Sequence, residues 1–272
     1  LLAGEEKLMV AFGEDSFVYL LEDLGLEFKD MNELICNITE EQKQSLYEMA
    51  ECGINEKAYR IEDLELMAPI VRPRQDVICL GINYDEHAKE AGQYSQEAFG
   101  GERPYTIYFS KRVSRATGPK EGIPSYEGLV DSLDYESELG VVLGKDIKGV
   151  SKEEALDAVF GYTVINDVSA RNLQTRHKQW YVGKSMDGFT PMGPCIVTAD
   201  EIEDVQDLEI NTEKRMVTVG RQSLNNVVFG FVDFRHFQQL PVQVLHILHI
   251  RNHHSLHPVV ARLLCLFFRL FQ

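Results

Sequence analysis

The sequence predicts an α+β fold that is mostly β, with a small α+β domain over residues 1–70 and a larger, strand-rich domain over residues 71–272. Three observations predict this fold. The chain of 272 residues is long enough to bury a large core and a small one. Its hydrophobic fraction of 44% and charged fraction of 26% are close to the averages of folded globular proteins. After residue 75, short apolar runs bounded by Gly, Pro or Asp recur, as strands separated by turns do.

The first domain combines short apolar stretches with one acidic helical segment. Phe17–Leu21 is an apolar stretch, and Thr39–Cys52 is predicted to be a helix. The opening Thr and Gln42 form a sequence typical of a capping box, in which each side chain accepts from a backbone N–H at the helix end. Pro69 and Pro73 then indicate a linker to the second domain.

The second domain is predicted to contain a series of strands with two helices between them. The strands are Val77–Leu80, Tyr105–Phe109, Glu138–Leu143, Val159–Ile165 and Cys195–Thr198. The helices are Asp85–Ala91 and Ser151–Ala158. The second helix has the acid-rich first turn that complements the helix dipole.

Charge and cysteine usage exclude several classes of protein. The formal net charge of −16 opposes binding to nucleic acid or anionic lipid, because Lys and Arg carry that affinity. The five cysteines are spread without a C-x-x-C pair, which argues against disulfides or a zinc knuckle. No apolar run approaches the roughly 20 residues that span a bilayer. We therefore expect a cytoplasmic protein with no nucleic-acid or membrane partner; since the chain does not begin with Met, a short N-terminal piece is expected to precede it.

Three carboxylates in the second domain are candidates for a metal site. Glu136 and Glu138 alternate along a predicted strand, so their side chains share one face and can bind one cation. Asp167 ends the next apolar strand, from which it can project into a pocket at the sheet edge. A solvated strand face and a turn or helix cap are the commoner explanations of these residues taken singly. Together they offer three oxygen ligands, which favours Mg²⁺, with Mn²⁺ and Ca²⁺ as alternatives.

A possible catalytic pair lies in the G-x-N-Y-x-x-H-x-x-E run that begins at Gly81. His87 and Glu90 are three residues apart, so on a helix they share a face, and Glu90 can orient the imidazole as a base. An exposed helix with an incidental histidine is the alternative.

Further motifs follow that run in a fixed order between residues 72 and 207. They are Phe109-Ser110-Lys111 leading to Gly118-Pro119, D-Y-E-S-E-L-G-V-V, N-D-V-S-A-R-N-L-Q and G-K-S-M-D-G-F-T-P-M-G-P. Their order and spacing resemble those of the fumarylacetoacetate hydrolase family. The resemblance implies a catalytic domain built as a mixed β-sandwich roll, behind a small N-terminal α+β domain and usually assembled as a homodimer.

The resemblance also implies three groups of site residues. The metal ligands would be Glu136, Glu138 and Asp167. The catalytic residues would be His87, Glu90 and Lys184, the first two as a pair on a short lid helix. The substrate-binding residues would be Tyr84, Arg171 and Gln174. A surface lysine and a solvated helix residue are the alternatives for Lys184 and Gln174.

The implied reaction is hydrolysis of a C–C bond in a small 2-oxo acid of the acylpyruvate or fumarylpyruvate type. A metal that binds the keto and carboxylate oxygens would stabilise the enolate formed when the bond breaks. His87 would deprotonate a water, and Lys184 would face the developing oxyanion. The alternatives are a decarboxylase or isomerase of oxaloacetate-like or hydroxymuconate-like acids, and a catalytically silent member that binds metal and a 2-oxo acid.

The segment 234–272 has an atypical composition. No Asp or Glu follows Asp233, no Gly follows Gly230, and six of the eight histidines fall in this stretch. A segment read in a different frame explains these changes together. The alternatives are a divergent terminus and a helix that binds zinc through histidines on one face. Those histidines would be His246, His249, His253 and His257.

Overall fold

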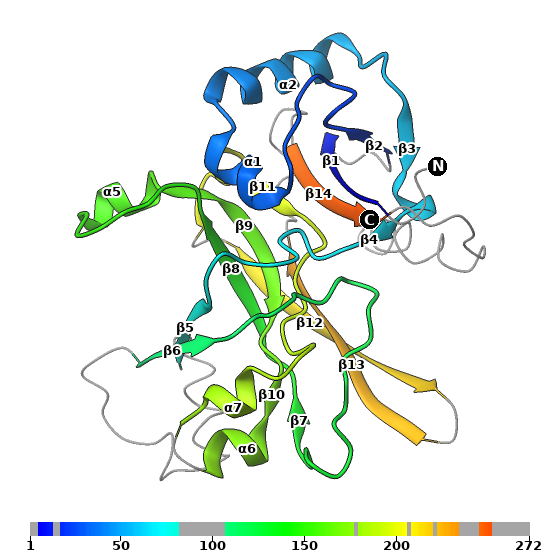
Figure 1. The fold of residues 1–272 in the computed structure, drawn as a ribbon, viewed down its shortest axis with the longest axis vertical. Coiled ribbons are helices and arrows are strands. Elements are labelled where there is room, and N and C mark those ends of the chain that lie inside the picture. Colours follow the sequence, from blue (N-terminus) through cyan, green and yellow to red (C-terminus); the bar gives the residue numbers. More distant parts are fainter. Residues whose placement is uncertain are drawn as a thin grey trace.

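The protein is a mixed α/β molecule with more strand than helix (Figure 1). The structure, a computed structural model, describes residues 5–12, 17–81, 107–176, 179–205, 208–219, 222–233 and 245–251. The helix predicted at Asp85–Ala91 lies outside these residues. The sandwich-roll arrangement of the second domain stays a prediction.

One large antiparallel sheet connects the two regions of the chain. Its strand order is β3-β2-β1-β14-β11-β9-β8, and β4 also pairs with β14. The strands are β1 (Glu6–Phe12), β2 (Phe17–Leu20), β3 (Ala58–Arg60), β4 (Glu65–Leu66), β8 (Ser137–Leu143), β9 (Val159–Asn166), β11 (Ile196–Thr198) and β14 (Leu245–Arg251). Strand β14 lies between β1 and β11, so it joins the N-terminal strands to those of the second region. Since residues 245–251 form a strand, they are not part of the helix on which a zinc site depended.

The helices of the first region cover its part of this sheet, in the upper part of Figure 1. They are α1 (Met31–Asn37) and α2 (Glu40–Cys52), followed by the short 3-10 helix η1 (Ile61–Asp63). The predicted capping box is present, because Thr39 accepts from the N–H of Gln42 at 3.2 Å and Gln42 accepts from the N–H of Thr39 at 3.0 Å. Leu34 and Leu46 on these helices lie in one apolar cluster with Phe160 of β9. The division at residue 70 stays a prediction, and the two regions share a sheet and this cluster.

The segment predicted to be a linker is packed into the core. Residues 68–71 form neither helix nor strand, yet Ala68, Ile70 and Val71 are all buried. The carbonyl of Val71 accepts from the N–H of Ala116 at 2.8 Å. The connection is therefore buried at residues 68–71, whereas Arg72 and the residues from Arg74 to Asp76 are exposed.

Among the described residues, three smaller sheets and four short helical segments complete the second region. The paired strands are β5 (Val77–Gly81) with β6 (Ile107–Lys111), β7 (Leu133–Asp134) with β10 (Ser169–Ala170), and β12 (Glu209–Val219) with β13 (Gln222–Asp233). The helical segments are α5 (Lys152–Leu156), α6 (Arg171–Arg176), α7 (Tyr181–Lys184) and the 3-10 helix η2 (Ala199–Glu201). All five predicted strands are present, with ends shifted by at most two residues. Helix α5 confirms the second predicted helix and is shorter than expected.

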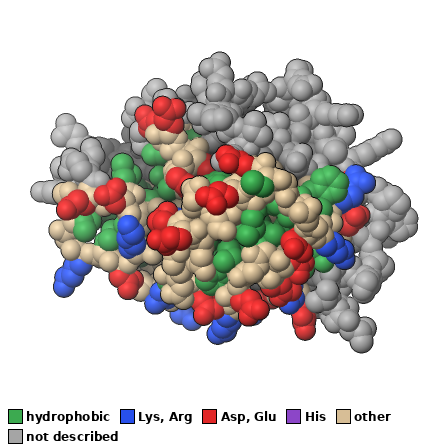
Figure 2. All heavy atoms as spheres, turned by 90° about the horizontal axis from the view of Figure 1, so that it is seen from above, with side chains coloured by type: hydrophobic (Ala, Val, Ile, Leu, Met, Phe, Trp, Pro, Cys, Tyr) green, Lys and Arg blue, Asp and Glu red, His purple; other side chains and the backbone are tan. Residues whose placement is uncertain are grey.

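The surface reflects the composition. The face in Figure 2 carries many acidic side chains, with fewer basic ones between them, as the net charge of −16 requires. Among the helices that the structure describes, none is both long and apolar enough to cross a bilayer.

Candidate active site

Glu136 and Asp167 come together at the end of the β8–β9 pair. Glu136 immediately precedes β8 and Asp167 immediately follows β9, and the register sets Ser137 opposite Asn166. The N–H of Asp167 donates to the carbonyl of Glu136 at 2.8 Å. The N–H of Glu136 donates to Oδ1 of Asn166 at 3.2 Å. Antiparallel pairing thus brings together the carboxylates of Glu136 and Asp167, which are far apart in the sequence.

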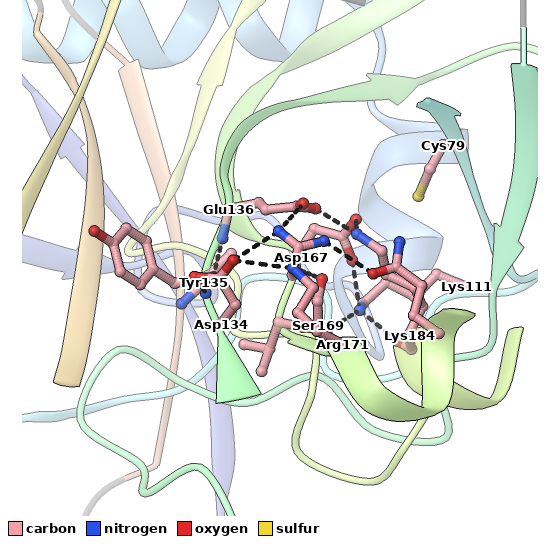
Figure 3. A network of polar contacts seen from close by, with 12 residues as sticks. Cys79, Lys111, Asp134, Tyr135, Glu136, Asp167, Ser169, Arg171 and Lys184 are labelled. Atoms are coloured by element: carbon pink, nitrogen blue, oxygen red, sulfur yellow. Dashed lines mark hydrogen bonds and ion pairs between the residues drawn. The ribbon is translucent and has the colours of Figure 1, made fainter. Parts of the chain in front are cut away.

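The ammonium of Lys184 bridges these two carboxylates (Figure 3). Its Nζ lies 2.6 Å from Oδ2 of Asp167 and also donates to Oε2 of Glu136. It lies 5.2 Å from the centre of the Phe109 ring, a distance typical of a cation–π contact. Lys184 ends α7 and is only 2% exposed, so it is not the surface lysine considered as an alternative.

A second lysine, Lys111, reaches the same aspartate from the end of β6. Its Nζ lies 2.7 Å from Oδ1 of Asp167 and 3.1 Å from the carbonyl oxygen of Val168, and it also donates to the carbonyl of Lys184. The residue is 0% exposed. The sequence contained this lysine within a recognised motif, but nothing in the motif indicated its role.

Arg171 forms ion pairs with Glu136 and with a third carboxylate, Asp134. Its Nη2 lies 2.6 Å from Oε1 of Glu136 and 2.7 Å from Oδ2 of Asp134, while Nη1 donates to Oε1 of Gln174 at 2.9 Å. Asp134 was not predicted as a site residue, although it precedes Glu136 and Glu138 at the same alternate spacing. Gln174 is buried, which excludes the solvated position considered for it. Arg171 therefore fixes the glutamate through a network of charge-assisted bonds.

The predicted metal ligands are only partly brought together. Glu136 and Asp167 converge on one cation, the Lys184 ammonium. Glu138 lies on β8 opposite Ile165, and its charge acts on the thiol of Cys79, as that of Asp167 does. Within the residues described, no three His, Cys, Asp or Glu side chains form a set of metal ligands. Tyr84, His87 and Glu90 lie outside the described residues.

The charges in this buried group stabilise one another. Burial by itself would raise the pKa of Asp167, but Lys111 and Lys184 lower it below its ordinary value. Burial lowers the pKa of the Lys111 ammonium, and the charge of Asp167 opposes that effect. Burial also acts to lower the pKa of Arg171, but Glu136 and Asp134 raise it overall. The aspartate is thus held as a carboxylate between two cations.

Cys79 lies near the buried carboxylates and lysines, and its thiol is expected to be unreactive. Burial, followed by the negative charge of Asp167, raises the pKa of its thiol to about 12. Because the thiolate is the reactive form, we expect iodoacetamide at pH 8 to label the exposed Cys52 in the native protein but not Cys79. Peptide mass spectrometry measures this, with urea-unfolded protein as the control in which both thiols react. Equal labelling rates in the native protein would contradict the assigned environment.

Comparison with known proteins assigns this chain to a family. The family described as "Fumarylacetoacetate (FAA) hydrolase C-terminal" matches residues 76–237, which contain every site residue named above. Oxaloacetate tautomerase YisK of Bacillus subtilis (strain 168) is 44% identical over 154 residues, which are 57% of this chain and 50% of that protein. The chain spans 50% to 65% of the length of the first curated relatives that it matches.

Solved structures agree with the sequence match. The fumarylacetoacetate hydrolase of the psychrophilic Exiguobacterium antarcticum is 30% identical, with a TM-score of 0.55 over 77% of this chain and 72% of that one. The maleylpyruvate hydrolase of Sphingobium sp. SYK-6 is 25% identical, with a TM-score of 0.57 over 76% of this chain and 70% of that one. The family match, the curated relative and these folds agree with the resemblance that the sequence motifs indicated. This chain belongs to the fumarylacetoacetate hydrolase family.

Proposed function

We propose that this protein is a divalent-metal-dependent enzyme that interconverts the keto and enol forms of a small 2-oxo acid, with an oxaloacetate-like acid as substrate. The observation that carries the proposal is the buried group in which Glu136 and Asp167 converge on one positive charge, with the Lys184 ammonium between them. The 44% identity to an oxaloacetate tautomerase supports this choice of reaction.

The proposed metal ligands are carboxylates, which a hard cation prefers. The oxygens of Glu136 and Asp167 converge on one cation, and Glu138 would supply a third carboxylate from the same end of β8. We therefore propose these three residues as the ligands of Mg²⁺, with Mn²⁺ or Ca²⁺ as alternatives. When bound, Mg²⁺ would withdraw electrons from the keto group of a 2-oxo acid and make the neighbouring C–H more acidic.

The chain's own residues would bind and orient the substrate. In the part of the chain that the structure describes, two of the three N–H bonds of Lys184 are used by carboxylates. The third can donate to an oxygen on which negative charge develops. Gln174 accepts from Arg171 through its oxygen, which leaves its amide nitrogen as a donor to a substrate carboxylate. Both side chains are buried, so each interaction would be stronger than in water.

Hydrolysis of a C–C bond in an acylpyruvate is the second candidate. The similarity to a maleylpyruvate hydrolase supports it. This reaction needs a base that activates water, and His87 oriented by Glu90 is the proposed pair. Tautomerisation forms an enolate of the substrate, and C–C hydrolysis releases an enolate of the 2-oxo acid product. Both reactions would therefore use the residues described above to stabilise an enolate. A homodimer in the cytoplasm is also proposed.

A metal-dependence assay tests the proposal. Purified protein is given oxaloacetate, acetylpyruvate or a hydroxymuconate-type acid, with Mg²⁺ or with EDTA, and ultraviolet absorbance follows the enol. We expect faster keto–enol interconversion of oxaloacetate with Mg²⁺, loss of the effect with EDTA, and recovery when Mg²⁺ is added in excess. Faster cleavage of acetylpyruvate than tautomerisation of oxaloacetate would favour the hydrolase instead. Mn²⁺ binding without turnover of any substrate would indicate a catalytically silent protein.

A further inference from the structure

We propose that Lys111 is a positioning residue of this site, which fixes Asp167 and the end of α7 and does not bind the substrate. The inference rests on the proposed function, because it concerns the proposed metal ligand Asp167 and the proposed substrate donor Lys184. The sequence motifs indicated a role for Lys184 and none for Lys111. The contacts of the two ammonium groups show how their roles differ.

The ammonium of Lys111 is saturated. It is fully buried, and a buried ammonium is stable only where carboxylates or carbonyls accept its N–H bonds. Asp167, the carbonyl of Val168 and the carbonyl of Lys184 provide three acceptors for its three N–H bonds. No donor remains for a substrate oxygen, so its role is confined to the protein.

The ammonium of Lys184 differs in this respect. Its contacts with described residues are the two carboxylates and the face of the Phe109 ring. It therefore retains an N–H bond that a substrate can accept. The two lysines share one aspartate, with one ammonium on each carboxylate oxygen (Figure 3). Of the two, only Lys184 has a donor left by the described residues.

The three acceptors of Lys111 lie on separate parts of the fold. Lys111 ends β6, Asp167 and Val168 form the corner between β9 and β10, and the carbonyl of Lys184 ends α7. One ammonium thus connects a two-stranded sheet, the end of the large sheet and the helix that carries the proposed donor. Carbonyls at a helix C-terminus lack partners within the helix, and Lys111 supplies one.

Packing leaves α7 little freedom on its other side. A Cβ added at Gly183 would lie 2.5 Å from the backbone nitrogen of Gln174 and 2.8 Å from the carbonyl oxygen of Ala170, so the helix backbone closely contacts α6 and β10. Lys111 holds the end of the same helix through a hydrogen bond. The position of the Lys184 side chain therefore depends on both contacts.

The Lys111→Met variant tests this role, because Met preserves the length of the side chain and removes its donors. We expect faster amide hydrogen exchange in Tyr181–Lys184, Mn²⁺ affinity reduced by about 10- to 100-fold, and a fall in kcat with little change in KM. Hydrogen-exchange mass spectrometry, Mn²⁺ titration and steady-state kinetics measure these effects. Leu46→Ala is the control, because it removes buried packing from α2 and is expected to lower Tm while leaving exchange of α7 and Mn²⁺ affinity unchanged.

The outcomes separate the inference from the proposed function. If α7 exchanges in Lys111→Met as in the wild type, Lys111 does not position the helix and the inference is wrong. If α7 exchanges faster but the wild-type protein binds no Mn²⁺, the metal part of the proposed function is wrong and the positioning role stands. If Leu46→Ala reproduces all the effects, they arise from lost stability, and the inference is again wrong.

Discussion

Replacing Asp167 with Asn is expected to abolish activity and to reduce the free energy of unfolding by about 3–5 kcal/mol, the usual effect of breaking a buried ion pair. The carboxylate lies between two ammonium groups, those of Lys111 at 0% exposure and Lys184 at 2%. The neutral amide would leave two buried positive charges sharing weaker acceptors. Urea unfolding and the Mg²⁺-dependent assay measure the two effects.

The control for this prediction is Asp146→Asn. Asp146 is exposed, so the same chemical change there should leave the free energy of unfolding within about 0.5 kcal/mol of the wild type. If Asp167→Asn were as stable as this control, the aspartate could not be the ionised partner of both lysines.

Replacing Lys184 with Met is expected to lower kcat by about 10²- to 10³-fold, as the loss of one oxyanion donor does in other enzymes. Stability should fall less than in Asp167→Asn, because Glu136 keeps Arg171 as a partner and Asp167 keeps Lys111. Mn²⁺ affinity should be unchanged or higher, since the ammonium no longer competes for the carboxylate oxygens. Steady-state kinetics and Mn²⁺ titration measure both.

Lys145→Met is the matched control, because it removes an exposed lysine, and we expect its kcat to stay within about twofold of the wild type. A Lys184→Met enzyme that kept kcat near this level would exclude Lys184 as the donor. Weakened Mn²⁺ binding in that variant would instead mean that Lys184 organises the carboxylates. Lys111→Met is expected to lower Mn²⁺ affinity and Lys184→Met is not, so this measurement distinguishes the two buried lysines.

The local elements of this fold could be predicted from the sequence because their signals are local. Alternating and apolar runs located β8 and β9. The Thr39 capping box and the acid-rich turn after Ser151 marked the starts of α2 and α5. The pairing of β14 with β1 could not be predicted, since it joins segments more than two hundred residues apart. The buried connection between the regions was also missed, because prolines signal a break in regular structure but not the burial of the residues around them.

Sequence motifs predicted some residues of the candidate site but not all of them. The motifs identified Glu136, Asp167 and Lys184, which the structure brings into direct contact. They did not indicate that Lys111 would contact them, because the burial of a lysine depends on acceptors from other elements. Arg171 and Gln174 were expected to bind substrate, which stays a prediction. The structure shows that they contact each other and that Arg171 contacts Asp134.

The buried segment around residues 67–71 links the packing of the two regions. Met67, Ala68, Ile70 and Val71 pack inside the protein, and the apolar cluster beside them draws residues from both regions. This stretch is therefore packed and is not a flexible hinge, and loss of the shared cluster would expose apolar surface of both regions together.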